Sequence, residues 1–133
     1  MHSPIAFAPP AEGSAGDGLV DTADLMGWDV ASRVAVLSRV YGDPSPQNAG
    51  AAARAMAWAW FVAGAPATVL TQWVVDTPGT SLLMQGFHRR LAPATGPAPR
   101  ASEALRQAIL PLLAGRNRHP FHWAGFTVMG DGR

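Results

Sequence analysis

The stretch Val34-Ala35-Val36-Leu37 is short and wholly apolar, and it lies between Arg33 and Ser38. A strand that is apolar on both faces is typical of a parallel sheet covered by helices, rather than of a hairpin with one wet face. A second such run, residues 67–71 (ATVLT), follows shortly after Gly64. The two runs predict neighbouring interior strands of one α/β sheet.

Helical periodicity alternates with these strands along the chain. Residues 49–63 are rich in alanine and carry Arg54 as their only charge, which predicts a largely buried helix. The expected order is a strand at 5–8, a short helix capped by Thr22, a strand at 34–37, a helix at 49–63, a strand at 67–71, helices beginning near 77 and 101, and a closing strand at 126–129. This order predicts an α/β fold with a mostly parallel sheet flanked by helices.

The amino-acid composition excludes several kinds of chemistry and of binding partner. The 133 residues are 48% hydrophobic, which is enough for one core, and 10 basic against 9 acidic residues leave a net charge of +1. Such a balance gives no field that would attract nucleic acid. All the basic residues are arginines and there is no cysteine, which excludes Schiff-base lysines, disulfides, thiolate metal sites and thiol nucleophiles.

The first residues of the chain show no recognisable signal peptide. The first residues lack a basic segment followed by an apolar run of the length found in signal peptides. The most apolar stretch, residues 55–70, is shorter than the roughly 20 residues that span a bilayer and is interrupted at Gly64. We therefore expect a cytoplasmic protein that does not enter a membrane.

Three blocks of sequence resemble one family when they are taken in order. The first is residues 17–25 (DGLVDTADL) with 35–38 (AVLS), the second is 61–65 (FVAGA) with 73–76 (WVVD), and the third is 103–108 (EALRQA) with 119–126 (HPFHWAGF). Together they resemble CHAT-domain proteins, relatives of caspases and separase. On this resemblance, residues 17–133 are a partial CHAT-like domain, and residues 1–16 are a loose segment with a possible short strand.

The resemblance implies a caspase-like sheet and, in active members, a cysteine peptidase with a histidine and a cysteine at the ends of adjacent strands. The family's Ala-Cys pair corresponds here to Arg39 and Val40, so the nucleophile position holds a hydrocarbon. The family's catalytic histidine belongs to a segment that precedes the matched region. The chain therefore resembles the C-terminal half of the domain, and we expect no catalytic residues in it.

A half-domain leaves part of the sheet uncovered. We expect the strand at 34–37 to be flanked on one side only by residues 5–8 or by another chain, since the missing half normally supplies the neighbouring strands. An uncovered apolar edge invites pairing. The expected function is a structural or protein-interaction module, with a protein partner or a second copy at the open sheet edge.

Four residues are candidates for a vestigial cleft: Ser38, Arg39, Trp73 and Asp76. The alternative, purely structural interpretation is core packing for Trp73 and helix capping for Asp76. An alternative function is a hydrolase of another type that uses Ser38 or His122, and a further alternative is the remnant of a longer CHAT protein.

His119 and His122 have a spacing seen in metal sites, but no third ligand lies nearby in the sequence and Pro120 separates them. We interpret the pair as a structural turn before the last strand, and we expect no metal and no cofactor. Core packing is likewise expected for Trp28, Trp58 and Trp60.

Overall fold

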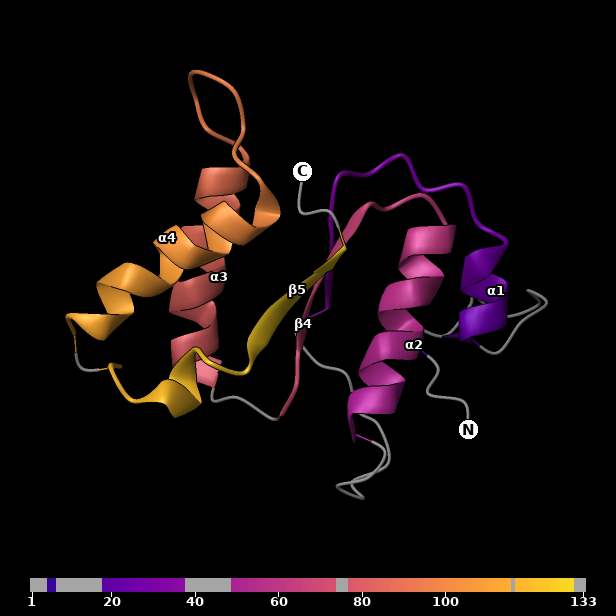
Figure 1. Cartoon of the computed structure of the whole chain (residues 1–133), viewed down its shortest axis with the longest axis horizontal. Helices are drawn as coiled ribbons and strands as arrows, with labels where there is room; N and C mark the ends of the chain where they lie inside the picture. Colours follow the sequence, from indigo (N-terminus) through magenta and orange to yellow (C-terminus); the bar gives the residue numbers. More distant parts are fainter. Residues whose placement is uncertain (1–4, 7–17, 38–48, 74–76, 116, 131–133) are drawn as a thin grey trace.

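The computed structural model describes residues 5–6, 18–37, 49–73, 77–115 and 117–130, and the following account is confined to them (Figure 1). The elements in chain order are β1 (Ile5–Ala6), β2 (Leu19–Val20), α1 (Thr22–Met26), β3 (Ala35–Leu37), α2 (Ala49–Val62), β4 (Ala67–Thr71), α3 (Thr77–Leu91), α4 (Ala101–Leu113), the 3-10 helix η1 (Pro120–His122) and β5 (Phe126–Gly130). The prediction of an α/β fold is confirmed.

Within these residues the main sheet has the strand order β3-β4-β5. Helix α2 covers one face, with α1 packed against α2, and the α3–α4 pair covers the other face (Figure 1). All five residues of β4 are buried, because this strand has a neighbour on each side and a helical layer on each face. The apolar run at 67–71 is therefore the centre of the sheet, as its composition predicts.

The prediction of a mostly parallel sheet is not confirmed. β3 pairs with β4 in parallel, but β5 pairs with β4 antiparallel. From the end of β4 the chain runs back along one face of the sheet in α3 and returns along the same face in α4. It therefore reaches the start of β5 at the edge where β4 ends (Figure 1). A strand that starts from that edge must run against β4, whereas a single crossing helix would have given a parallel strand.

The antiparallel ladder fixes which backbone groups of β5 point outward. The Gln72 N–H donates to the Gly125 carbonyl over 2.8 Å, at the position just beyond the paired strands. Hydrogen-bonded and non-hydrogen-bonded pairs alternate along an antiparallel ladder. Val69 and Val128, three positions further along, therefore form a non-hydrogen-bonded pair. It follows that the N–H and C=O of Val128 point away from β4.

The same alternation orients the backbone of β3. Because the N–H and C=O of Val69 do not face β5, they face β3, where Val69 is level with Val36. In a parallel pair such groups bond to the residues on either side of the level position, here Ala35 and Leu37. The N–H and C=O of Val36 therefore point away from β4.

The N-terminal strand does not cover β3. Ile5 and Ala6 pair antiparallel with Val20 and Leu19, in a two-stranded sheet of their own. The expectation that this segment flanks the strand at 34–37 is therefore wrong for residues 5–6, while residues 7–8 lie outside the described part of the chain. The two-residue strand β2 is too short to show an alternating pattern, so it could not be predicted from periodicity.

The residue that caps α1 is Asp21, not Thr22 as predicted. The Asp21 carboxylate accepts from the N–H groups of Ala23 and Asp24 at 2.7 and 2.9 Å. The Asp24 carboxylate in turn accepts from the Asp21 N–H at 3.0 Å, which completes a capping box. Thr22 is the first residue of the helix itself.

The expectation that α2 is largely buried is wrong for its large side chains. Trp58 is 59% exposed and Phe61 is 51% exposed, whereas the buried side chains of α2 are small, apart from Met56. Alanine at the sheet-facing positions lets the helix axis come close to β4, and Trp58 and Phe61 then project beside these alanines, next to the end of β5. Trp28 is also exposed, at 41%, and only Trp60 packs against a core cluster.

The largest core lies between the sheet and the α3–α4 pair. Leu83 and Phe87 on α3 are fully buried against β4, β5 and α4, and Leu91 packs at the margin of this cluster. The predicted stripe of Leu83, Phe87 and Leu91 is thus confirmed as the inner face of α3. No helix among the described residues is long and apolar enough to cross a membrane.

Candidate functional site

The carboxyl ends of β3 and β4 lie at one edge of the sheet, because the two strands are parallel and Leu37 is level with Leu70. Both α2 and α3 begin at this edge (Figure 1). In α/β folds the loops that follow parallel strands at such an edge are the usual place for a binding or catalytic site. Val40 follows β3 by three residues in the sequence, and Trp73 follows β4 by two.

Trp73 is the candidate residue whose position can be compared with the prediction. Its side chain is 41% exposed, so core packing is the wrong interpretation. It leaves the sheet where β4 ends, beside the hydrogen bond from Gln72 to Gly125. An exposed indole at this place offers an apolar surface at the carboxyl edge of the sheet.

The other cleft candidates, Ser38, Arg39, Asp76 and the nucleophile position Val40, lie outside the described residues. Their arrangement around Trp73 therefore stays a prediction.

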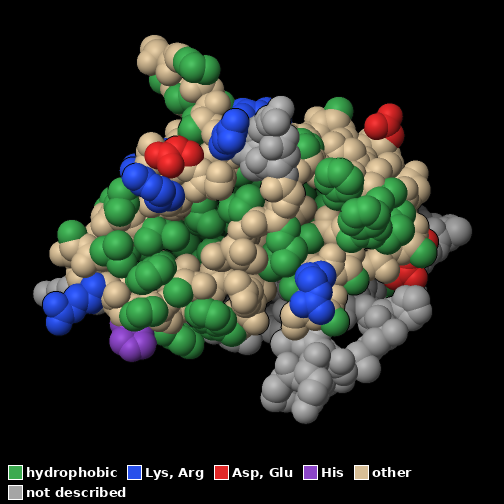
Figure 2. Space-filling model, viewed as in Figure 1, with side chains coloured by type: hydrophobic (Ala, Val, Ile, Leu, Met, Phe, Trp, Pro, Cys, Tyr) green, Lys and Arg blue, Asp and Glu red, His purple; other side chains and the backbone are tan. Residues whose placement is uncertain are grey.

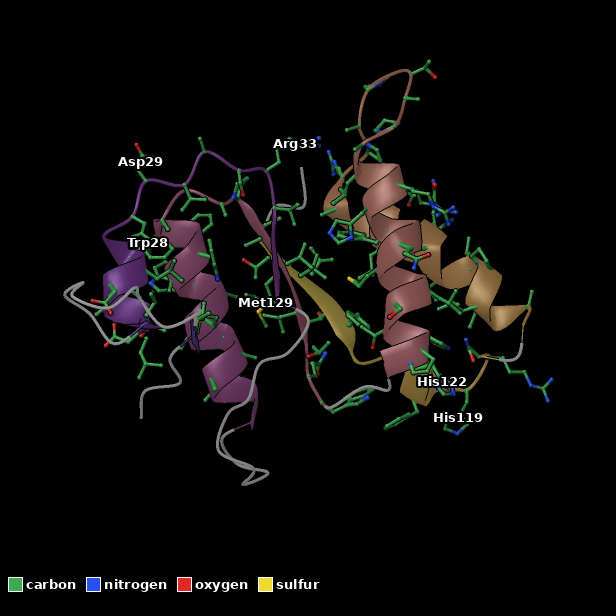
Figure 3. All side chains as sticks on the ribbon, turned by 180° about the vertical axis from the view of Figure 1, so that it is seen from behind. Trp28, Asp29, Arg33, His119, His122 and Met129 are labelled. Carbon is green, nitrogen blue, oxygen red and sulfur yellow. The ribbon has the colours of Figure 1, made fainter. Side chains whose placement is uncertain are left out.

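His119 and His122 lie at the same end of the molecule, near the start of α3 (Figure 3). His119 caps η1, its Nδ1 accepting the Phe121 N–H at 3.2 Å, and the Trp123 indole N–H donates to the Arg118 carbonyl at 3.3 Å. The rings of His119 and His122 lie edge to face with centroids 6.4 Å apart. Such an arrangement supports a turn that leads the chain into β5.

No group of three or more metal-ligating side chains occurs in the part of the chain that the structure describes. The imidazole pair thus has no further ligand there, and its contacts are those of a capped turn. No cofactor follows from this geometry.

A family model described as the CHAT domain matches residues 1–131. The chain belongs to the CHAT domain family. This CHAT match begins at residue 1 and so includes the segment that the sequence analysis separated at residues 1–16. A comparison with curated proteins and another with solved structures each found no match.

This CHAT domain also has a pocket that was not predicted from the sequence. This pocket of about 330 Å³ lies between α2 and the end of β5, lined by Arg54, Ala57, Trp58, Phe61 and Met129, among others. Residues 54, 58 and 61 follow helical spacing and share one face of α2, so a stripe of one cation and two aromatics was visible in the sequence. It was missed because an alanine-rich helix was expected to bury its aromatic residues.

Proposed function

We propose that this CHAT domain is a non-catalytic module that binds other polypeptide chains through its sheet. The observation that carries the proposal is the absence of cysteine from all 133 residues. Active members of the family, as the resemblance implies, attack the peptide carbonyl with a thiolate. Val40, at the position of that thiolate, has no lone pair and no ionisable proton, so it supplies no nucleophile.

The open side of β3 supports a binding role. β3 pairs with β4 alone among the described residues, and the Val36 N–H and C=O point to the other side. Val36 and Leu37 are only partly buried. An unpaired backbone row with apolar side chains on both faces is a template for a strand from another chain, either a partner protein or a second copy.

We expect the purified chain to hydrolyse no peptide. The measurement is turnover of a broad fluorogenic peptide library by the full chain, with the Ser38→Ala and His122→Ala variants tested in parallel. These variants remove the nucleophile and the base of the alternative hydrolase. The proposed function predicts that none of the three proteins hydrolyses the peptides faster than buffer alone does. Turnover by the wild type that either substitution abolishes would contradict it.

A further inference from the structure

The outer edge of β5 lies between two apolar surfaces, one on each face of the sheet. Figure 2 shows hydrophobic side chains over α4 and over α2, on the two sides of the edge strand β5. On the α2 side is the pocket of about 330 Å³ with Trp58 and Phe61. On the α4 side is a shallower groove of about 500 Å³ lined by Ile109, Leu110 and Val128, among others. β5 therefore has uncovered apolar surface on both of its faces.

The backbone between these surfaces is available for pairing. Within the described residues no strand lies beyond β5 in the sheet. The Val128 N–H and C=O point outward, as the ladder requires, whereas the Phe126 N–H is already bonded to the Trp123 carbonyl at 3.2 Å. An added strand would hydrogen-bond to Val128, and its side chains would alternate between the two apolar surfaces.

The α2 surface also carries a cation, Arg54, that has no counter-charge among the described residues. Arg54 lines the pocket and makes no ion pair or hydrogen bond with any residue that the structure describes. The neighbouring rings of Trp58 and Phe61 stack with centroids 5.7 Å apart. A carboxylate on the added strand would complete the polar part of this site, because a guanidinium pairs with a carboxylate in bidentate geometry.

We propose that the outer edge of β5 binds an extended segment of another polypeptide, with apolar side chains on both faces and an acidic residue opposite Arg54. The acidic residue and a large apolar residue lie two positions apart, since both face α2. Charge complementarity favours this occupant over a second copy. The strand β5 itself (residues 126–130, FTVMG) has no acidic residue, so a copy paired through β5 would place no carboxylate from that strand opposite Arg54.

This site is separate from the edge of β3 and does not depend on the absence of peptidase chemistry. β3 and β5 lie on opposite sides of β4. A result against the β5 site would therefore leave the proposed function standing, and turnover in the peptidase assay would leave the β5 site standing.

The test is selection of a displayed library of random seven-residue peptides on the full chain. The most enriched peptide is then synthesised, and its affinity is measured by fluorescence anisotropy. We expect enriched sequences with an acidic residue two positions from a large apolar residue. Arg54→Gln should weaken binding of the synthetic peptide about tenfold. Arg89→Gln, an exposed arginine on α3, is the matched control and should leave the affinity unchanged.

A second pair of variants tests the backbone contact. Val128→Pro removes the outward N–H without removing a bond to β4, as edge strands tolerate. Val128→Ala also trims the side chain but keeps the N–H. We expect the proline variant to bind at least about tenfold more weakly than the alanine variant. Trp58→Ser, at an exposed position, provides a further variant if the proline variant does not unfold cooperatively, and it should also weaken binding about tenfold.

Three results would overturn the proposal. The first is no enrichment over a blank support. The second is an enriched peptide that binds the wild type and the Arg54→Gln and Trp58→Ser variants equally. The third is a dimer of the wild type in light scattering that Val128→Pro dissociates and Val128→Ala does not, which would assign the β5 edge to a second copy.

Discussion

Replacing Phe87 by alanine should lower the free energy of unfolding by about 3–5 kcal/mol. Phe87 is fully buried, and it is the largest of the fully buried side chains in the described residues. It lies on α3 in the cluster that joins β4, β5 and α4, so its loss leaves a cavity where the helical layer meets the sheet. Because small domains are stable by about 5–15 kcal/mol in total, this one substitution removes a large part of the stability.

The measurement is urea denaturation followed by tryptophan fluorescence. Leu82→Ala is the matched control, since Leu82 lies on the same helix but is 53% exposed. Its effect should stay within about 0.5 kcal/mol. Equal destabilisation by the two variants would show that α3 does not turn its Phe87 face to the sheet.

Replacing Gly64 by alanine should cost about 2–4 kcal/mol of unfolding free energy. Gly64 follows α2 with a φ of 111°, a backbone conformation that side-chain-bearing residues rarely adopt. A Cβ at this position would also lie 2.9 Å from the Val30 carbonyl oxygen. The Val30 N–H donates to the Ala63 carbonyl at 2.7 Å, so the segment cannot move away without straining that bond.

Gly96 provides the control for this second prediction. Its φ is 81°, but a Cβ there would meet no atom within 4 Å. Gly96→Ala should therefore cost only the conformational part, about 1–2 kcal/mol. Urea denaturation of the two variants separates the cost of the backbone conformation from the cost of the close contact with Val30. A Gly64→Ala variant no less stable than Gly96→Ala would contradict the close approach of Val30 to the turn.

Much of the fold follows from local pattern. The run at 67–71 is bounded by a helix-ending glycine and by polar Gln72, and it is the buried central strand that its composition predicts. The stripe of Leu83, Phe87 and Leu91 likewise has the spacing of one helical face. In both cases the residues that decide the structure are neighbours in the sequence, or one helical turn apart.

The features that local pattern did not reveal depend on distant parts of the chain. The direction of β5 follows from the number of helices that cross between it and β4, and nothing within residues 126–130 encodes it. The exposure of Trp58 depends on how closely the alanines of α2 approach the sheet. The pairing of Ile5 with Val20 joins two very short segments, neither of which shows a periodic pattern.

The candidate site, too, was predictable from the sequence only in part. The sequence made Trp73 a candidate for a cleft, with core packing as the alternative; its 41% exposure argues against core packing, and its part in a cleft stays a prediction. The absence of a thiol is fixed by composition alone and needs no fold. The β5 edge with Arg54 and Trp58 required the structure, because it combines residues from α2 with the backbone of a strand about 70 positions later.

The proposed function depends on an open edge at β3 and the further binding site on an open edge at β5, and amide hydrogen exchange of the full chain, monitored by NMR, tests both edges most directly. The Val36 and Val128 N–H groups point outward, whereas those of Leu37 and Met129 are bonded to β4. We predict that Val36 and Val128 exchange at least about 100-fold faster than Leu37 and Met129, because they need no opening of the sheet. Equal protection of all four amides would show that both edges are already paired, and would contradict the account.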